Sequence, residues 1–177
     1  MSEVTIRRAR PAEYATAGAL TVEAYRASGY TEADSPYAAK LADGATRARE
    51  AELWVAVDGE DGPDTGPDTG SAAVLGTVTT APPSSPWAQV AGPADLEFRM
   101  LAVSPAARGR GIGEALTRAV VDRAVELGLT GIVLSSSTQM TTAHRIYERL
   151  GFRRTPGKDW SPSAGTSLIT YRLDLAG

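Results

Sequence analysis

The sequence predicts a single mixed α/β domain, and three observations support this fold class. The length of 177 residues suits one domain. Hydrophobic residues make up 42% and charged residues 22%, with a formal net charge of −3, which is typical of a globular protein. Segments with the two-residue period of strands alternate with segments of helical period, in the order β-α-α-β-β-β-α-β-α-β-β. Residues 1–177 are therefore expected to form one domain.

The first elements follow from periodicity and from the residues that end each run. Val4–Arg10 alternates as a strand does and ends at a proline, which suits the first turn of a helix over Pro11–Ala27. A second helix is predicted over Pro36–Glu50, although Gly44 interrupts its pattern.

Two β-rich runs, Glu52–Val57 and Ala73–Thr80, flank a repetitive stretch that contains GPDT twice. The stretch predicts a low-complexity hairpin loop over residues 59–70. Its aspartates could supply oxygen ligands to calcium, but their spacing does not match the calcium-loop pattern, so a linker is favoured.

The second half continues the alternation after a Pro- and Ser-rich connection, residues 82–93. Strand and helical periods alternate regularly there. The expected elements are a strand at Asp95–Val103, a helix at Ile112–Leu127, a strand at Gly131–Ser135, a helix at Thr141–Leu150, and strands at Phe152–Arg154 and Ser167–Leu175.

Composition excludes several kinds of chemistry. The chain has no cysteine, which excludes disulfides, thiolate catalysis and cysteine zinc sites, and its single histidine, His144, does not favour a metal centre. The net negative charge gives no general footprint for nucleic acid or an anionic membrane. A charged N-terminus and the lack of 18 consecutive apolar residues predict a cytoplasmic protein.

The segment RGRGIG, between a predicted strand and a predicted helix, is the first candidate site. Glycines leave the backbone open, and the helix dipole adds positive potential, so a phosphate or pyrophosphate is the expected ligand, reinforced by Arg108 and Arg110. A nucleotide P-loop would need GK[ST], and a dinucleotide fingerprint would need glycine where Leu116 stands. A plain tight turn is the alternative. The converging amides would be those of Gly109, Arg110, Gly111, Ile112 and Gly113.

Together with a second motif, this segment resembles the GCN5-related N-acetyltransferase (GNAT) superfamily. The pyrophosphate motif [RQ]-x-x-G-x-[GA] is filled by Arg108, Gly111 and Gly113. The later motif A-x-x-x-Y-x-x-x-G-F is filled by Ala143, Tyr147, Gly151 and Phe152. The resemblance implies a central mixed, mostly antiparallel sheet, splayed between strands 4 and 5 and flanked by about four helices. It also implies acetyl-CoA as co-substrate, with no metal.

The resemblance implies a place for the acetyl-CoA arm. Backbone groups of residues 101–103 (Leu101, Ala102 and Val103) would pair with pantetheine, and the Val103 amide would stabilise charge on the thioester oxygen. Small Ala143 would leave room for the cofactor. Many relatives carry Asn where this chain has Met140, so that side-chain contact would be missing.

Two residues are candidates for proton transfer in such a reaction. The resemblance implies that Tyr147 protonates the departing thiolate, although a core tyrosine is the alternative. It makes Glu97 the candidate base, the alternative being a charge pair with Arg99. On a regular strand Glu97, Arg99, Leu101 and Val103 would share a face, and a bulge would shift that alternation.

The expected reaction is transfer of an acetyl group from acetyl-CoA to a primary amine by direct attack in a ternary complex. Ser135–Ser137 has no paired base in the sequence, and His144 is expected to be exposed or near the adenosine. The alternative is a non-catalytic acyl-CoA-binding or regulatory module on the same fold. The acceptor, a small molecule or peptide, would bind near residues 11–50 and 82–95. Glu32, Asp34 and Asp95 there hint at a cationic amine, and a monomer or homodimer is expected.

Overall fold

The computed structural model describes residues 3–30, 35–59 and 72–176. The chain divides into two compact units, one of Met1–Thr79 with Met100–Leu116 and one of Thr80–Arg99 with Thr117–Gly177. The described residues form a mixed α/β fold with five α-helices, and most strands pair antiparallel. The predicted fold class is therefore confirmed.

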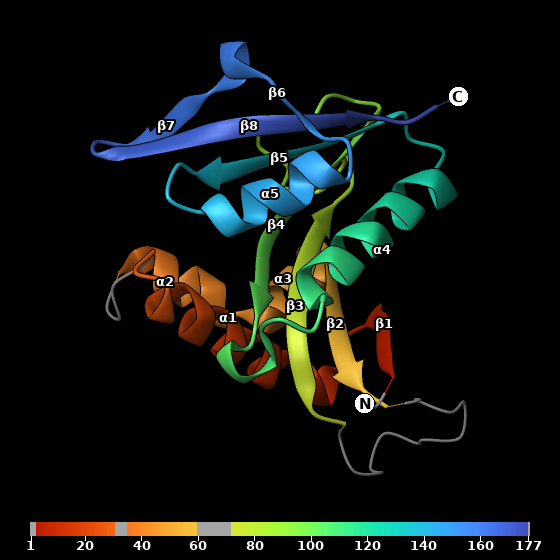
Figure 1. Ribbon diagram of the computed structural model, residues 1–177, viewed down its shortest axis with the longest axis vertical. Helices are drawn as coiled ribbons and strands as arrows, with labels where there is room; N and C mark the ends of the chain where they lie inside the picture. The colour runs from red at the N-terminus through yellow and green to blue at the C-terminus, as the bar shows by residue number, and fades with distance from the viewer. Residues whose placement is uncertain (1–2, 31–34, 60–71, 177) are drawn as a thin grey trace. The chain divides into compact units, whose positions relative to one another are not determined.

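The first unit contains strands and helices from the N-terminal part of the chain (Figure 1). Its strand order is β1-β2-β3-β4, and β1 pairs antiparallel with β2. Side chains of α1 and β2 form a buried cluster that includes Ala17, Leu53 and Val55. Its elements are β1 (Val4–Arg8), α1 (Tyr14–Ala27), α2 (Pro36–Ala42), α3 (Gly44–Glu50), β2 (Glu52–Asp58), most of β3 (Val74–Ala81), the end of β4 and the start of α4.

The helix predicted over Pro36–Glu50 is wrong, because two helices occupy that segment. The backbone breaks at Asp43, with φ −85° and ψ 71°, and its carboxylate accepts a hydrogen bond of 3.0 Å from the Thr46 N–H to begin α3. A side chain at Gly44 would clash with the backbone carbonyl of Tyr14, so glycine permits close packing of α3 on α1. The described residues therefore contain five α-helices, in keeping with the expected number of about four.

Arg47 holds the three N-terminal helices together from within. Its side chain is fully buried and donates to the Leu41 carbonyl at 2.6 Å, to Thr79 Oγ1 at 3.1 Å and to Thr21 Oγ1 at 3.3 Å. One guanidinium therefore links α3 to α1, α2 and β3, a use of arginine that its helical position did not indicate.

The second unit contains strands in the order β4-β5-β8-β6, with β7 also paired to β8. The parallel pairing of β4 with β5 joins Asp95–Glu97 to Gly131–Val133. β5 pairs antiparallel with β8 along its whole length. Helix α5 lies along β5 and β8 (Figure 1). The elements are the start of β4 (Asp95–Val103), most of α4 (Ile112–Glu126), β5 (Gly131–Ser137), α5 (Thr141–Arg149), β6 (Arg153–Arg154), β7 (Trp160–Ser163) and β8 (Thr166–Asp174).

The prediction from sequence periodicity missed β7 and ended β5 two residues too early, at Ser135. Strand β7 contains a proline within WSPS and is mostly exposed, so it carries no apolar alternation. β5 extends to Ser137 because its three serines pair with Leu168, Ile169 and Thr170 of β8. Strands β2 and β3 flank the predicted hairpin loop, and residues 60–70 of that loop lie outside the described residues.

Candidate active site

The loop before α4 has the backbone conformation that its glycines favour. Gly109 and Gly111 have φ values of 83° and 75°, which side chains rarely adopt. Nothing lies within 4 Å of where a Cβ would stand at either residue. Helix α4 begins at Ile112, so its N-terminal N–H groups and dipole favour an anion at this point. The loop therefore fits a pyrophosphate that approaches the backbone closely.

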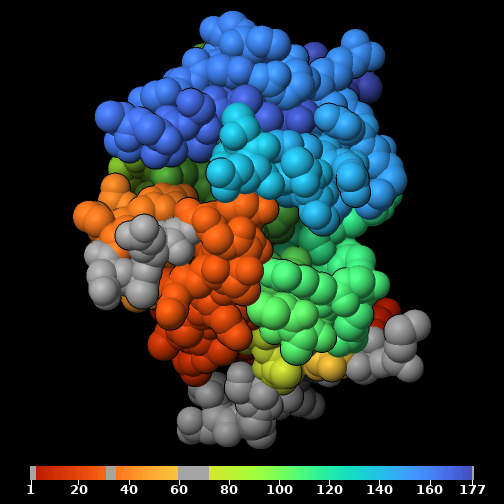
Figure 2. Space-filling model, turned by 60° about the vertical axis from the view of Figure 1, so that its left-hand side comes forward, coloured from red at the N-terminus to blue at the C-terminus, as the bar shows by residue number. Residues whose placement is uncertain are grey.

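Two arginines flank these glycines, and each already has a partner. Arg108 donates to Ser28 Oγ at 3.1 Å, and Figure 2 shows the green loop segment beside the red-orange helix α1 at the surface. Arg110 forms an ion pair of 3.1 Å with Asp58. Asp58 offsets part of the positive charge that Arg110 was expected to offer, while Arg108 faces only a neutral hydroxyl in this contact.

The end of β4 carries the backbone groups expected to pair with pantetheine. Ala102 is buried against Leu20 and Ala24 of α1. Leu101 and Val103 are half-buried. The next N–H, that of Ser104, donates to the Leu75 carbonyl at 2.8 Å, which ties the end of β4 to β3.

Strand β4 is interrupted at Met100, which has a φ of 56°. This positive φ is not extended backbone, so the alternation of faces does not continue across it. The strand is therefore not regular, and the shift in alternation that an interruption would cause separates Leu101 and Val103 from the face of Glu97 and Arg99. Glu97 and Arg99, both before the interruption, still share a face.

Tyr147 lies in an aromatic cluster on α5. Its ring is 5.7 Å from Phe98, 5.8 Å from Phe152 and 5.9 Å from Tyr171, between centroids. Burial, reinforced by Tyr171, raises the pKa of the Tyr147 phenol well above its ordinary value of 10.0. Burial thus keeps the phenol in its neutral form and makes it a weaker acid than an exposed tyrosine.

His144 is buried, so the first of the two expectations for it, an exposed side chain, is wrong. Its Nε2 lies 3.0 Å from Ser136 Oγ, and its ring packs against Tyr171. Ser136 is also buried. Because His144 lies within hydrogen-bond distance of Ser136, the expectation that no base pairs with Ser135–Ser137 is wrong too. Burial is the main cause that lowers the pKa of His144, against smaller opposing effects of Ser137 and Glu148.

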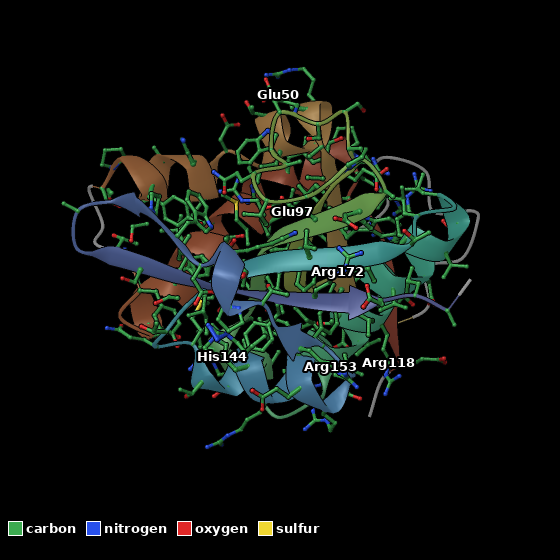
Figure 3. The ribbon with its side chains drawn as sticks, turned by 90° about the horizontal axis from the view of Figure 1, so that it is seen from above. Glu50, Glu97, Arg118, His144, Arg153 and Arg172 are labelled. Atoms are coloured by element: carbon green, nitrogen blue, oxygen red, sulfur yellow. The ribbon has the colours of Figure 1, made fainter. Side chains whose placement is uncertain are left out.

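Glu97 is fully buried, on the side of β5 and β8 opposite His144 (Figure 3). Its Oε2 accepts hydrogen bonds from three successive backbone N–H groups, at 2.7 Å from Gln89, 2.9 Å from Val90 and 3.1 Å from Ala91. Its other oxygen, Oε1, is buried and has no hydrogen-bond partner among the described residues. The carboxylate is thus held in place by one oxygen only.

Arg99, two residues along the strand, does not form the charge pair with Glu97 that was the alternative. Its guanidinium lies 5.4 Å from the centroid of the Trp87 ring, and Nη1 donates to the Trp87 carbonyl at 3.3 Å. Within the described parts of the chain, no carboxylate forms an ion pair with Arg99. From the sequence, Trp87 was one of several aromatic residues that could line an acceptor pocket, and Arg99 was a charge partner for Glu97. Their contact with each other was not foreseen, because a Trp followed 12 residues later by Arg carries no recognisable signal.

Asp95 has a structural partner and no longer hints at a cationic acceptor. Its carboxylate forms a 2.8 Å ion pair with Arg172 and accepts from the Gly92 N–H at 2.9 Å. Glu32 and Asp34, the other two acidic residues of that hint, lie outside the described residues.

Helix α5 begins at the position where an amide side chain was expected to be missing. Met140 is its N-cap residue and gives no side-chain hydrogen bond there. Ala143, one turn along, is half-buried.

The described residues hold no group of three or more His, Asp or Glu side chains arranged for a metal ion. None of the described helices combines the length and apolar character needed to span a membrane.

Comparison with known proteins identifies the family. Residues 19–152 match the Acetyltransferase (GNAT) family, and the chain belongs to this family. A rat (Rattus norvegicus) protein named N-acetyltransferase 8B is 36% identical over 121 residues, which cover 68% of this chain and 47% of that protein. The chain thus spans about half the length of this relative.

Solved structures share the fold. A GNAT-family acetyltransferase from Staphylococcus aureus Mu50 gives a TM-score of 0.73 at 14% identity, covering 98% of this chain and all, 100%, of that one. A GNAT-family acetyltransferase from Brucella melitensis in complex with acetyl-CoA gives a TM-score of 0.60 at 21% identity, covering 100% of this chain and 91% of that one. At these identities the likeness concerns the fold alone.

Proposed function

We propose that this chain transfers an acetyl group from acetyl-CoA to a primary amine by direct attack in a ternary complex. The observation that carries the proposal is the loop with two left-handed glycines at the start of the 15-residue helix α4. Membership of the GNAT family supports acetyl transfer as its use.

Acetyl-CoA, when bound, supplies an acetyl group activated as a thioester. The backbone of Gly109–Gly113 would hold its pyrophosphate, with Arg108 as the flanking cation. The backbone of Leu101–Val103 would pair with pantetheine, and the Val103 N–H would donate to the thioester oxygen. Met140 and Ala143, at the start of α5, would contact the arm without a side-chain hydrogen bond.

Proton transfers are assigned to two residues with different surroundings. Glu97 would accept the proton of the attacking amine at Oε1, directly or through water, because this oxygen has no donor of its own. Tyr147, which the family motif places at this position, would give its phenol proton to the departing thiolate as the sulfur gains negative charge.

Direct attack is favoured over a covalent acetyl-serine. Ser136 and His144 form a hydrogen-bonded pair, but both are buried, and the histidine ring is packed against Tyr171. A ternary complex gives intersecting lines when initial rates are measured over both substrates. Parallel lines would indicate a covalent intermediate and overturn direct attack.

The test of the binding loop is Gly111→Asp. The aspartate places a negative charge and a Cβ where the phosphate must approach, so CoA affinity measured by calorimetry should fall by more than about 100-fold. CoA release stimulated by amines should disappear with it.

Gly165→Asp is the matched control. Gly165 has a φ of 83°, with nothing within 4 Å of its would-be Cβ, so the substitution introduces the same strain in the turn between β7 and β8. This variant should keep CoA affinity. Unchanged affinity in Gly111→Asp would overturn the site, whereas tight CoA binding without turnover on any amine would favour the non-catalytic module.

A further inference from the structure

We infer that the acceptor is an amino-acid-type molecule, with a carboxylate close to its reactive amine, and that Arg99 binds this carboxylate beside Glu97. The inference rests on the proposed acetyl transfer and names the class of its second substrate. Its basis is a pair of opposite charges on β4 that do not neutralise each other.

Glu97 and Arg99 lie on the face of β4 opposite α5. Phe98, between them, packs against Tyr147 and Phe152 with ring centroids 5.7 and 6.1 Å apart. Neighbouring side chains of a strand point to opposite faces, so Glu97 and Arg99 both point away from that aromatic cluster. They meet the segment before β4, where Glu97 binds the amides of residues 89–91 and Arg99 contacts Trp87.

Arg99 is positioned as an anion receptor. The Trp87 ring lies against its guanidinium, and the Trp87 carbonyl takes one N–H, which fixes the plane of the group. A guanidinium has five N–H donors in a fork that suits a carboxylate. Arg99 is half-buried, and within the described residues it has no carboxylate partner.

Glu97 offers the complementary group. Its Oε1 is buried without a hydrogen donor among the described residues, and a buried acceptor in that state is costly. An ammonium group, or a water bound to it, supplies the missing donor. Two residues along a strand span about 7 Å, so one small molecule with both charges can reach Glu97 and Arg99.

The same contacts argue against a polyamine. Asp95, the nearest other carboxylate along the strand, is paired with Arg172. A second cationic centre near Arg99 would meet repulsion instead of a partner. A peptide N-terminus fits less well also, because its carboxylate lies far from its amine.

The experiment compares each amino acid with its own carboxamide, which keeps the amine and side chain and removes the negative charge. For the wild-type protein we expect kcat/KM to favour the amino acid. In Arg99→Gln the ratio of the two kcat/KM values should fall about 10- to 100-fold, chiefly through KM for the amino acid. Arg99→Lys, which restores charge without the fork, should recover part of it.

Arg145→Gln is the matched control, because Arg145 is exposed on α5 and the substitution removes the same charge. Its ratio should stay at the wild-type value. Equal ratios in wild type and Arg99→Gln, with both variants folded by thermal melting, would overturn the inference while leaving amine acetylation intact.

Calorimetry with CoA present separates this inference from the proposed function. If no amine is acetylated, the proposed function fails, and binding then decides the inference. Amino-acid binding that Arg99→Gln weakens and Arg145→Gln does not would support the role of Arg99. Absence of any amino-acid binding would overturn it.

Discussion

The two faces of β4 in the second unit differ in how they treat ionisable groups. One face carries Glu97 and Arg99, buried or half-buried charges that meet backbone groups and an indole ring. The other face carries Phe98 against Tyr147, beside Tyr171, in an aromatic cluster. Burial there raises the pKa of the tyrosine phenol.

In the proposed mechanism, the candidate base lies on one face of β4, and the candidate acid, Tyr147 of α5, packs against the other face. Three backbone amides donate hydrogen bonds to one oxygen of Glu97. The aromatic cluster supplies none to a phenolate, so Tyr147 keeps its proton. The proposed mechanism would thus place the two proton-transfer residues in different environments on opposite faces of β4.

The strongest test of this contrast is Glu97→Gln. The amide keeps the shape but cannot take a proton, so kcat should fall by about 10²–10⁴-fold if Glu97 is the base. The rate should be measured with both substrates saturating, at a temperature at which the variant is folded.

Asp95→Asn is the matched change two residues away on the same strand. It breaks the ion pair with Arg172 and should lower the free energy of unfolding, by about 1–3 kcal/mol, without a comparable loss of kcat. If both variants lost turnover equally, Glu97 would have no catalytic role that distinguishes it from the structural Asp95.

On the aromatic face, Tyr147→Phe removes one oxygen and keeps the ring. We expect kcat to fall by about 10–10³-fold, less than for the base because water can protonate part of the thiolate, while acetyl-CoA affinity hardly changes. Tyr171→Phe removes the same oxygen from the ring 5.9 Å away, where it donates to Glu148, and should keep its turnover. Near-normal turnover of Tyr147→Phe, with chemistry rate-limiting, would leave this residue a core tyrosine.

The smallest expected effect concerns His144 and pH. Its pKa in the folded protein lies below the ordinary 6.5, so the unfolded chain binds the proton first as the pH falls. The stability that this residue contributes is complete above pH 6.5 and is lost as the pH falls through the lowered pKa. His144→Gln should remove this part of the pH dependence in urea unfolding measured from pH 7.5 to about pH 5. An identical slope in both proteins would show that His144 does not titrate differently on folding.

Much of the fold could be predicted from sequence because its signals are local. The strand Asp95–Val103 was predicted with its observed bounds, and α4 begins at Ile112 as expected. The break at Asp43 was missed, although Gly44 marked the interruption, and the close packing of Gly44 on the Tyr14 carbonyl joins residues distant in sequence. Contacts between distant residues also hid the Arg47 hydrogen bonds.

The site divides in the same way. The glycine loop and Tyr147 follow from short motifs, whereas the Ser136–His144 pair depends on how α5 packs against β5. The donors to Glu97 are equally hidden, because backbone N–H groups leave no mark in the side-chain sequence. At the interruption, Met100 has a left-handed backbone conformation, which methionine has no intrinsic preference to adopt.

The three amides that donate to Glu97 also bear on how the segment before β4 can change over evolutionary time. Because the peptide backbone makes the hydrogen bonds, the side chains of Gln89, Val90 and Ala91 can be exchanged while the hydrogen bonds to the Glu97 carboxylate persist. Proline is the exception, since it has no N–H to give. A mutational library over residues 89–91 can therefore vary the side chains of this segment while the carboxylate stays in register.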